Sequence, residues 1–194
     1  MSKYVVICVF MLMGYVIWTE IPVDRGPGVT AENAPIIEKI KESESFEYKE
    51  SSLTSVMAVK AKVRVLDRER YFFDNMSSFS PIDVLIGWNE MSDQRNLEFL
   101  HFSMSSRDWD HKLTRLPLSV QELRDQTALW HLIPSTPEIK KRINNLRDGH
   151  IITLEGYLVN VLDKEGFKWE TSTSLDDTQR PRNEIVWVTS LAVN

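Results

Sequence analysis

Asp108, Asp110 and His111 are the residues whose types and spacing are best suited to chemistry, because they lie in one four-residue stretch, DWDH. Two carboxylates and an imidazole can share acid–base catalysis or hold a metal ion. In a strand, Asp108 and Asp110 would share a face and His111 would point away, whereas in a turn all three can converge. Aspartates are also common in solvated turns. The three are therefore candidate catalytic residues, with a wet turn as the alternative.

The stretch 87–93, GWNEMSD, supplies the candidate binding residues Trp88, Asn89, Glu90 and Asp93. A polar loop on a rigid scaffold is a common place for recognition of a ligand or partner. The alternative is structural: the tryptophan would fill the core and the polar side chains would cap neighbouring helices. We expect Trp88 to be mostly buried and to fix the loop, and Asn89, Glu90 and Asp93 to be at least partly exposed.

Metal and cofactor sites are not indicated elsewhere in the sequence. His101, His131 and His150 lie on separate expected elements, and no pair of histidines has the spacing of a zinc-binding helix. Cys8 is the only cysteine and belongs to the N-terminal apolar run, so the domain has neither a disulfide nor a cysteine metal site. The sequence therefore predicts no metal and no cofactor.

The charge balance argues against nucleic acid as a partner. The 194-residue chain has a formal net charge of -5 and no long basic run. Phosphate neutralisation needs clustered lysine and arginine, so a nucleic-acid-binding barrel in the cytoplasm is disfavoured. Trp88, Trp109 and Trp130 would be able to stack on cell-wall sugars if they were exposed, but buried tryptophan is more common.

The first apolar run, residues 4–18, contains no charged residue. Aromatic residues lie towards its ends, where they favour the headgroup region of a bilayer. Lys3 precedes the run and Glu20 follows it, so the positive-inside bias places the N-terminus in the cytoplasm. We expect residues 1–22 to form a single-pass transmembrane anchor in a bacterial inner membrane. The remaining chain would then lie outside the cytoplasm, in the periplasm.

A cleaved signal peptide is the main alternative for this run, whose length matches a typical apolar signal region. No pair of small residues suitable for cleavage follows within a few residues of Trp18. A retained anchor is therefore favoured over cleavage, and a buried helix is a third possibility.

The composition after the anchor divides the chain into a linker and one domain. Residues 21–35 carry three prolines and two glycines, which favour an extended spacer. Residues 36–50 are charge-dense and either continue this spacer or form a short helix. We therefore expect a linker over 23–50, either extended throughout or part helical, and a β-rich globular domain over 51–194.

Strand patterns dominate that domain, at 56–66, 98–104, 128–133, 150–162 and in the final stretch IVWVTSL. Short helices are expected to begin at Ser80-Pro81, at the capping box Ser119–Glu122 and at Thr136-Pro137. Gly156 within a strand predicts a bulge or sharp bend. The expected fold is strand-dominated α+β: a small, partly closed β-barrel with short helices, of which the OB fold is one form.

Several segments resemble a group of bacterial membrane-anchored proteins to which no activity is attached. The resemblance rests on Gly26-Pro27-Gly28 after the apolar run, and on the stretches GWNEMSD, HLIP and DGHIITLEGYLV. It implies an anchored envelope protein and supplies no catalytic residue.

These observations favour a non-enzymatic envelope protein with a binding or interaction domain and a protein partner in the envelope. The lipid bilayer would be contacted through residues 4–18. The alternative is an anchored hydrolase that uses Asp108, Asp110 and His111, perhaps with a metal. Convergent carboxylates in a deep pocket would favour the hydrolase, and an apolar groove would favour binding.

Overall fold

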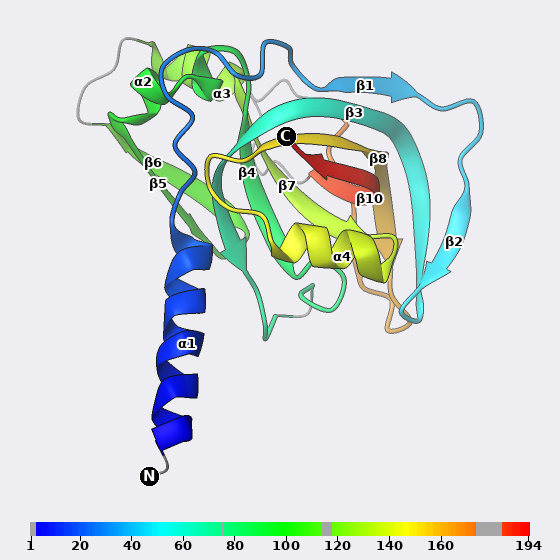
Figure 1. Cartoon of the computed structure of the whole chain (residues 1–194). Helices are drawn as coiled ribbons and strands as arrows, with labels where there is room; N and C mark the ends of the chain where they lie inside the picture. The colour runs from blue at the N-terminus through cyan, green and yellow to red at the C-terminus, as the bar shows by residue number, and fades with distance from the viewer. Residues whose placement is uncertain (1–2, 75, 114–117, 174–183) are drawn as a thin grey trace.

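The computed structural model describes residues 3–74, 76–113, 118–173 and 184–194 (Figure 1). Its strands are β1 (Ile36–Lys39), β2 (Ser45–Tyr48), β3 (Ser51–Arg70), β4 (Ile82–Gly87), β5 (Leu100–Ser105), β6 (Asp108–Leu113), β7 (Thr127–Pro134), β8 (Ile151–Leu162), β9 (Lys168–Trp169) and β10 (Glu184–Val193). Its helices are α1 (Lys3–Glu20), the 3-10 helix η1 (Asn89–Ser92), α2 (Gln94–Leu97), α3 (Val120–Asp125) and α4 (Pro137–Asn144). The expected strand-dominated α+β class is confirmed.

Five strands pair around a ring. β3 pairs with β4, β4 with β7, β7 with β10 and β10 with β8, and β8 pairs again with β3. The β7–β10 pair is parallel and the other pairs of the ring are antiparallel. Outside this ring, β1 and β2 pair with β3, and β9 pairs with β8. The sheet is thus partly ring-like, in agreement with the expected partly closed arrangement.

The interior of the ring is filled by every second side chain of its strands. In β3, Val59 and Val63 are buried, whereas Lys60 and Lys62 are exposed, which is the alternation that the sequence predicts. Helix α4 adds Ile139, Ile143 and the following Leu146 to the same core. The helix begins, as expected, with Thr136 as its N-cap and proline in its first turn.

Gly156 allows β8 and β10 to approach closely. A Cβ atom there would lie 2.1 Å from the carbonyl oxygen of Trp187. The register of β10 against β8 shifts between Val188 and Ser190. The mid-strand glycine therefore marks an irregular position, as its sequence context suggested.

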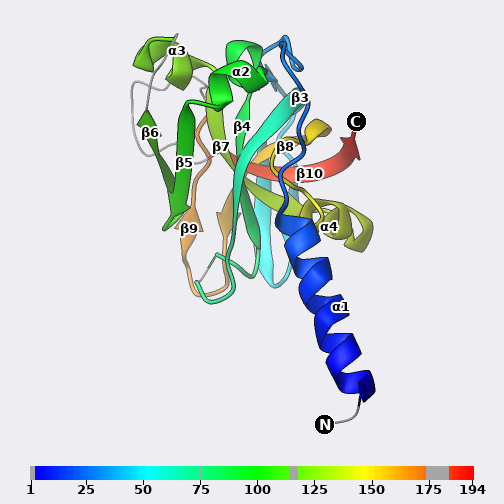
Figure 2. The same cartoon turned by 60° about the vertical axis from the view of Figure 1, so that its left-hand side comes forward.

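The β5–β6 hairpin covers the outer face of β4 and β7 (Figure 2). Leu85 and Leu129 point to this face and pack in one cluster with Leu100, Trp109 and Leu123. Because side chains alternate along a strand, the neighbouring residues of β4 and β7 face the ring interior instead. The molecule thus has two apolar layers, one inside the ring and one between the ring and the hairpin.

The prediction of a helix that begins at Ser80-Pro81 is wrong, because this segment leads into strand β4. Ile82, Val84 and Ile86 are buried in the ring interior, and β4 pairs with β3 on one side and with β7 on the other. Good capping residues favour a helix only locally, and pairing with two strands overrides that preference.

Helix α1 occupies the position of the expected transmembrane anchor, of which residues 1–2 lie outside the described part of the chain. It projects away from the domain (Figures 1 and 2). Among the described residues, no helix combines the length and the apolar character needed to cross a membrane.

Residues 23–50 are built into the domain rather than forming a free linker. The Val23 amide donates to the Asp148 carbonyl at 2.7 Å, and Ala31 is fully buried. Further along, β1 and β2 both pair with β3. Proline and glycine predicted a first part without helices, and residues 21–35 form neither helix nor strand. That composition does not reveal whether extended backbone docks on a domain or runs free.

Candidate functional site

The three candidate catalytic residues lie on β6 and do not converge. Asp108 and Asp110 share the exposed face, and each accepts a 2.8 Å hydrogen bond from the amide of the next residue. His111 points to the other face, where its ring centroid lies 5.7 Å from that of Trp109. Within the described residues, no three histidine, cysteine or acidic side chains are grouped to hold a metal ion.

The 87–93 loop agrees in part with its expected exposure. Trp88 is 3% exposed, whereas Asn89 and Glu90 are exposed. Asp93 is fully buried, so its expected partial exposure is wrong. Its carboxylate caps α2 by accepting from the Arg95 amide at 2.9 Å, and it accepts from the Gly28 amide at 3.0 Å. The hydrogen bond from the Arg95 side chain also holds the pKa of Asp93 well below its usual range.

The polar groups of this loop bind a segment of the same chain. The Ser92 hydroxyl oxygen accepts from the amides of Thr30 and Ala31, both at 3.0 Å. The Asn89 amide donates to the Ala31 carbonyl at 2.7 Å. Glu90 accepts a 3.1 Å hydrogen bond from the Asn96 side chain. The loop therefore fixes the N-terminal segment, and this structural task occupies much of its hydrogen-bonding capacity.

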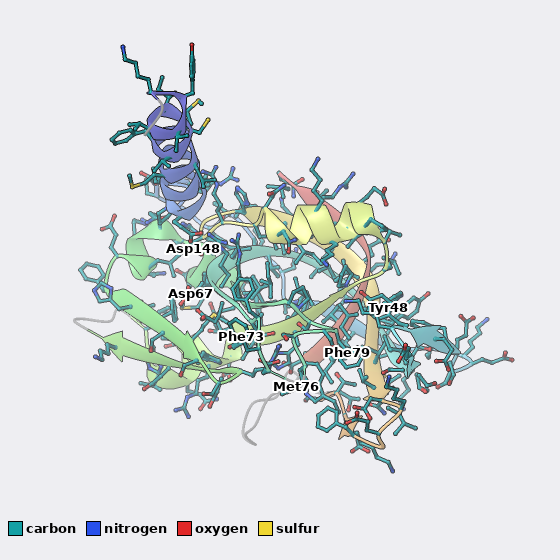
Figure 3. All side chains as sticks on the ribbon, turned by 90° about the horizontal axis from the view of Figure 1, so that it is seen from below. Tyr48, Asp67, Phe73, Met76, Phe79 and Asp148 are labelled. Carbon is teal, nitrogen blue, oxygen red and sulfur yellow. The ribbon has the colours of Figure 1, made fainter. Side chains whose placement is uncertain are left out.

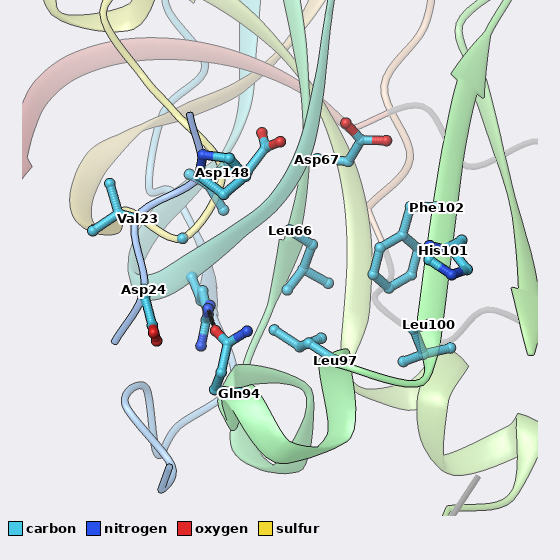
Figure 4. A pocket seen from close by; sticks show the side chains of 14 residues that line it. Val23, Asp24, Leu66, Asp67, Gln94, Leu97, Leu100, His101, Phe102 and Asp148 are labelled. Carbon is cyan, nitrogen blue, oxygen red and sulfur yellow. Dashed lines mark hydrogen bonds between the residues drawn. The ribbon is translucent and has the colours of Figure 1, made fainter. Parts of the chain in front are cut away.

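A more promising site is a cavity of about 460 Å³ near the base of α1 (Figure 4). We call it the carboxylate pocket, and it is lined by Pro22, Val23, Asp24, Arg64, Val65, Leu66, Asp67, Gln94, Leu97, Leu100, His101, Phe102, Asp148 and Gly149. Figure 4 shows the carboxyl groups of Asp67 and Asp148 at one end and the side chains of Gln94, Leu97 and Leu100 at the other.

Two backbone irregularities bring the carboxyl groups into the pocket. The pairing of β3 with β4 shifts register between Val65 and Asp67, and such a bulge re-aims the side chains that follow it. Asp148 lies in the turn between α4 and β8. The next residue, Gly149, has φ +84°, and a Cβ atom there would lie 2.0 Å from the Val23 carbonyl oxygen. The glycine thus lets the segment after α1 form one wall of the pocket.

The pocket disfavours the ionised forms of both carboxyl groups. Burial, with a further contribution from the charge of Asp67, raises the pKa of Asp148 to about 6. Arg68 opposes this rise, with its Nε 3.7 Å from the Asp148 Oδ1. Burial likewise raises the pKa of Asp67, and the charge of Glu69 adds to the effect. Perturbed carboxyl groups in a cavity are a common mark of a functional site.

The basic side chains around the pocket already have partners. Arg64 donates to the Ser92 carbonyl at 3.0 Å and also to the Gln94 side-chain oxygen. Arg68 donates to Glu20 at 2.7 Å. The free hydrogen-bonding capacity of the lining is therefore mostly that of acceptors, which suits a ligand that brings its own donors and positive charge.

Sequence reasoning missed this pocket for a physical reason. Asp67 belongs to the charged run DRER at the end of β3, and Asp148 precedes a turn glycine. Neither segment carries a motif, because the pocket exists only when the ring closes and the segment after α1 docks. The single local signal was the acidic residue beside a turn glycine, which is too common to be specific.

A second polar cluster is enclosed except at Asp74, whose side chain is 32% exposed. Arg107 donates to Asp83 at 2.8 Å and to the two Asp74 oxygens at 2.9 and 3.1 Å. The His131 Nδ1 lies 2.8 Å from the same Asp83 oxygen. Asp83 and His131 are both 0% exposed, so a substrate does not reach them. We assign this cluster a structural role.

Comparison with known proteins gives no family: neither the protein-family models, nor the curated proteins, nor the solved structures include one that matches this chain. The function must therefore be inferred from the pocket and its surroundings.

Proposed function

We propose that this protein is a membrane-attached, non-enzymatic binding module of a bacterial envelope. Residues 4–18 of α1 would enter the inner membrane, and the β-rich domain would bind a protein partner outside the cytoplasm. The observation that carries the binding role is the carboxylate pocket, in which two carboxyl groups of raised pKa line a cavity beside the segment that follows α1.

The exposed apolar surface of α1 supports attachment to a membrane. The helix has 18 residues, a length of about 27 Å. Its side chains are 37–79% exposed at Tyr4, Val5, Val6, Ile7, Val9, Phe10, Met11, Leu12 and Met13. Leaving so much contiguous apolar surface in water is unfavourable, and transfer to lipid removes that cost.

The orientation follows from the charges that flank α1. Lys3 lies before the apolar run and Glu20 and Asp24 lie after it, a charge asymmetry that supports a domain outside the cytoplasm. A reporter enzyme that works only in the cytoplasm, fused after Asn194, should be inactive. Strong reporter activity would mean the opposite orientation.

The ligand that best fits the carboxylate pocket is a lysine or arginine side chain of the partner protein. Its charge would relieve the repulsion between Asp67 and Asp148 and would favour their ionised forms. Its aliphatic stem would lie against the apolar wall formed by Leu66, Leu97 and Phe102. A guanidinium group would also match a carboxylate in planar, bidentate geometry.

This assignment is tested by an NMR titration of the Asp148 carboxyl group in the full-length protein in lipid nanodiscs. The probe is Nα-acetylarginine amide, and Nα-acetylcitrulline amide is a neutral control of the same shape. The arginine probe should lower the Asp148 pKa from about 6, and the citrulline probe should not. Asp148→Asn should weaken arginine binding, whereas Asp110→Asn, on an exposed strand face, should leave it unchanged. Equal effects of both probes would exclude recognition of a cation.

The strand order supports an OB-like barrel as the scaffold of this module. The ring contains five strands, and α4 lies between β7 and β8, the third and fourth of them in the chain. OB barrels often bind oligonucleotides on the face of their second and third strands. Here the β5–β6 hairpin packs over that face of β4 and β7, which supports a partner other than nucleic acid.

A hydrolase is the second candidate, and one observation favours it. A carboxyl group with a pKa of about 6 is well suited to general acid or base catalysis near neutral pH. Two carboxyl groups in one pocket are also the arrangement that the sequence criterion assigns to a hydrolase. The described lining contains no serine, threonine or cysteine, so hydrolysis there would have to use water activated by a carboxylate. Binding stays the first proposal, because the apolar wall of Leu66, Leu97 and Phe102 suits the aliphatic stem of a bound side chain. The proposed residues Asp108, Asp110 and His111 lie on two faces of β6, which does not support their joint action.

A further inference from the structure

Two phenylalanines stand exposed side by side in the loop between β3 and β4. Phe72 is 73% exposed and Phe73 is 99% exposed, and their ring centroids are 6.3 Å apart. Exposed aromatic pairs are unfavourable in water and usually mark a contact surface. Nothing in the carboxylate pocket or in the core uses these two rings.

The loop that carries them is held firmly on both sides by Arg107. On one side, the Arg107 amide donates to the Tyr71 hydroxyl at 3.0 Å, and the guanidinium lies 4.1 Å from the Tyr71 ring centroid. On the other side, the Arg107 guanidinium pairs with Asp74. Burial tends to raise the pKa of Asp74, but the hydrogen bonds and charge of Arg107 outweigh it and the pKa is lowered. Tyr71 and Asp74, on either side of the two rings, are therefore both anchored to Arg107.

This loop lies at the same end of the domain as α1. Both are at the lower end in Figures 1 and 2, and both lie toward the viewer in Figure 3, where Phe73 is labelled. A cavity of about 740 Å³ separates them, lined by Glu20 from α1, Arg70 to Phe72 from the loop side, and Lys140 and Asn144 from α4. A membrane that holds α1 would therefore lie next to the phenylalanines.

The cavity has a positive character. Arg70 and Lys140 line it, whereas its acidic residue, Glu20, is paired with Arg68. Lys49 lies close by, since burial and then the charge of Lys140 lower its pKa. The Arg70 Nη2 donates to the Asn144 carbonyl at 2.8 Å, but its buried Nε has no partner among the described residues.

We propose that the surface formed by Phe72, Phe73, Arg70 and Lys140 is a second membrane contact that selects bilayers with anionic lipids. The phenyl rings enter the acyl region, and the two cations hold the phosphate of an anionic headgroup in the cavity beside α1. Phenyl rings are apolar and gain free energy when they are buried at the boundary between headgroups and acyl chains, and each cation near an anionic surface adds to the attraction. This inference rests on the proposed attachment through α1.

Hydrogen exchange of the full-length protein in nanodiscs tests the contact. One set of discs contains phosphatidylcholine alone, and the other contains phosphatidylcholine with phosphatidylglycerol. The amides of Phe72, Phe73 and Asp74 should exchange several-fold more slowly in the anionic discs than in detergent. In neutral discs the slowing should be smaller, since only the rings contribute.

Paired variants separate the two parts of the contact. Phe72→Ser with Phe73→Ser should abolish the slowing in both kinds of disc, whereas Phe99→Ser, beside α2 at the other end of the domain, should retain it. Lys140→Gln, alone or with Arg70→Gln, should remove only the difference between anionic and neutral discs. Lys112→Gln, on the exposed face of β6, is the matched control for charge and should retain that difference.

Two failures are distinguishable. If the protein enters the discs but its loop exchanges equally in discs and detergent, the second contact is wrong and the attachment through α1 stands. If the protein does not associate with either disc, the attachment is wrong and this inference falls with it. Equal slowing in anionic and neutral discs would overturn the selection of anionic lipids.

Discussion

At the scale of single residues, Asp148 shows how a binding pocket can oppose stability. Its pKa of about 6 lies above the usual value of 3.8, so the folded protein binds this proton more tightly than the unfolded chain does. The resulting stabilisation is fully present below about pH 4 and is lost as the pH rises through about 6. Above that range the folded state carries an ionised carboxylate that its surroundings disfavour.

Asp148→Asn should therefore raise the melting temperature by a few degrees at pH 8 and change it little at pH 4. The amide keeps the shape of the side chain and removes the charge that the pocket disfavours. Thermal scans at the two pH values measure this difference, with Asp110→Asn as the control on an exposed face. An equal change at both pH values would contradict the raised pKa.

Arg107 is the residue on which the enclosed polar cluster depends. Arg107→Leu should destabilise the domain by about 3–5 kcal/mol, because it leaves Asp83 buried without its cation. Asp83→Asn in the same chain should recover part of that loss. Urea unfolding measures the free energy of unfolding of both variants. The control Lys141→Leu, on the solvent-exposed face of α4, should stay within about 0.5 kcal/mol of the parent protein. A loss as small as that of the control would mean that Arg107 contributes little.

Local patterns predicted the burial of Trp88, which follows an apolar segment, and the capping box at Ser119 and Glu122, which is present. Local patterns did not predict the burial of Asp93, because the Gly28 amide that donates to its carboxylate is distant in the chain. They give no sign that Arg107 is buried, because its partners Asp74 and Asp83 lie in other segments. Burial of a charged residue depends on partners from other segments, and one sequence does not display those partners.

At the scale of elements, glycines control how the segment after α1 docks. Gly149 has φ +84° and lies against the Val23 backbone, whereas Gly166 has φ +87° and open space around it. Alanine at either position is strained by the backbone angle, but only Gly149→Ala also meets another backbone.

Gly149→Ala should therefore cost more than about 1 kcal/mol and clearly more than Gly166→Ala. It should also speed the hydrogen exchange of the Val23 amide, which donates to Asp148. Chemical unfolding and hydrogen exchange are measured on both variants. Gly166→Ala reports the cost of backbone strain alone, and Gly149→Ala reports the cost of strain together with the clash against Val23. Equal costs for the two variants would show that the close approach to Val23 contributes nothing.

β3 and β8 were predictable because each has a periodic apolar face, and β7 was predictable because it is a short apolar run. β1 and β2 were not, because their charge-dense residues gain stability from pairing with the long strand β3. β4 was mistaken for a helix for the same reason: its neighbours, rather than its own residues, decide its conformation.

At the scale of the whole molecule, the ring and the N-terminal segment form one folding unit. The segment from Val23 to Ala31 is held by Asp148, Ser92 and Asp93, and β1 and β2 cover β3. The expected domain boundary at residue 51 would remove all of these contacts. Helix α1, in contrast, stands apart from the ring (Figure 2).

A chain that starts at residue 21 should therefore be soluble and melt cooperatively, whereas one that starts at residue 51 should aggregate or melt without cooperativity. The shorter chain leaves Leu53 and the long strand β3 uncovered, and an exposed strand edge promotes association. It also leaves Asp93 buried without the Gly28 amide, one of its donors. Light scattering and calorimetry compare the two chains under the same conditions. If both melt cooperatively at similar temperatures, residues 21–50 do not belong to the folding unit, and the carboxylate pocket is closed by a segment that contributes little to stability.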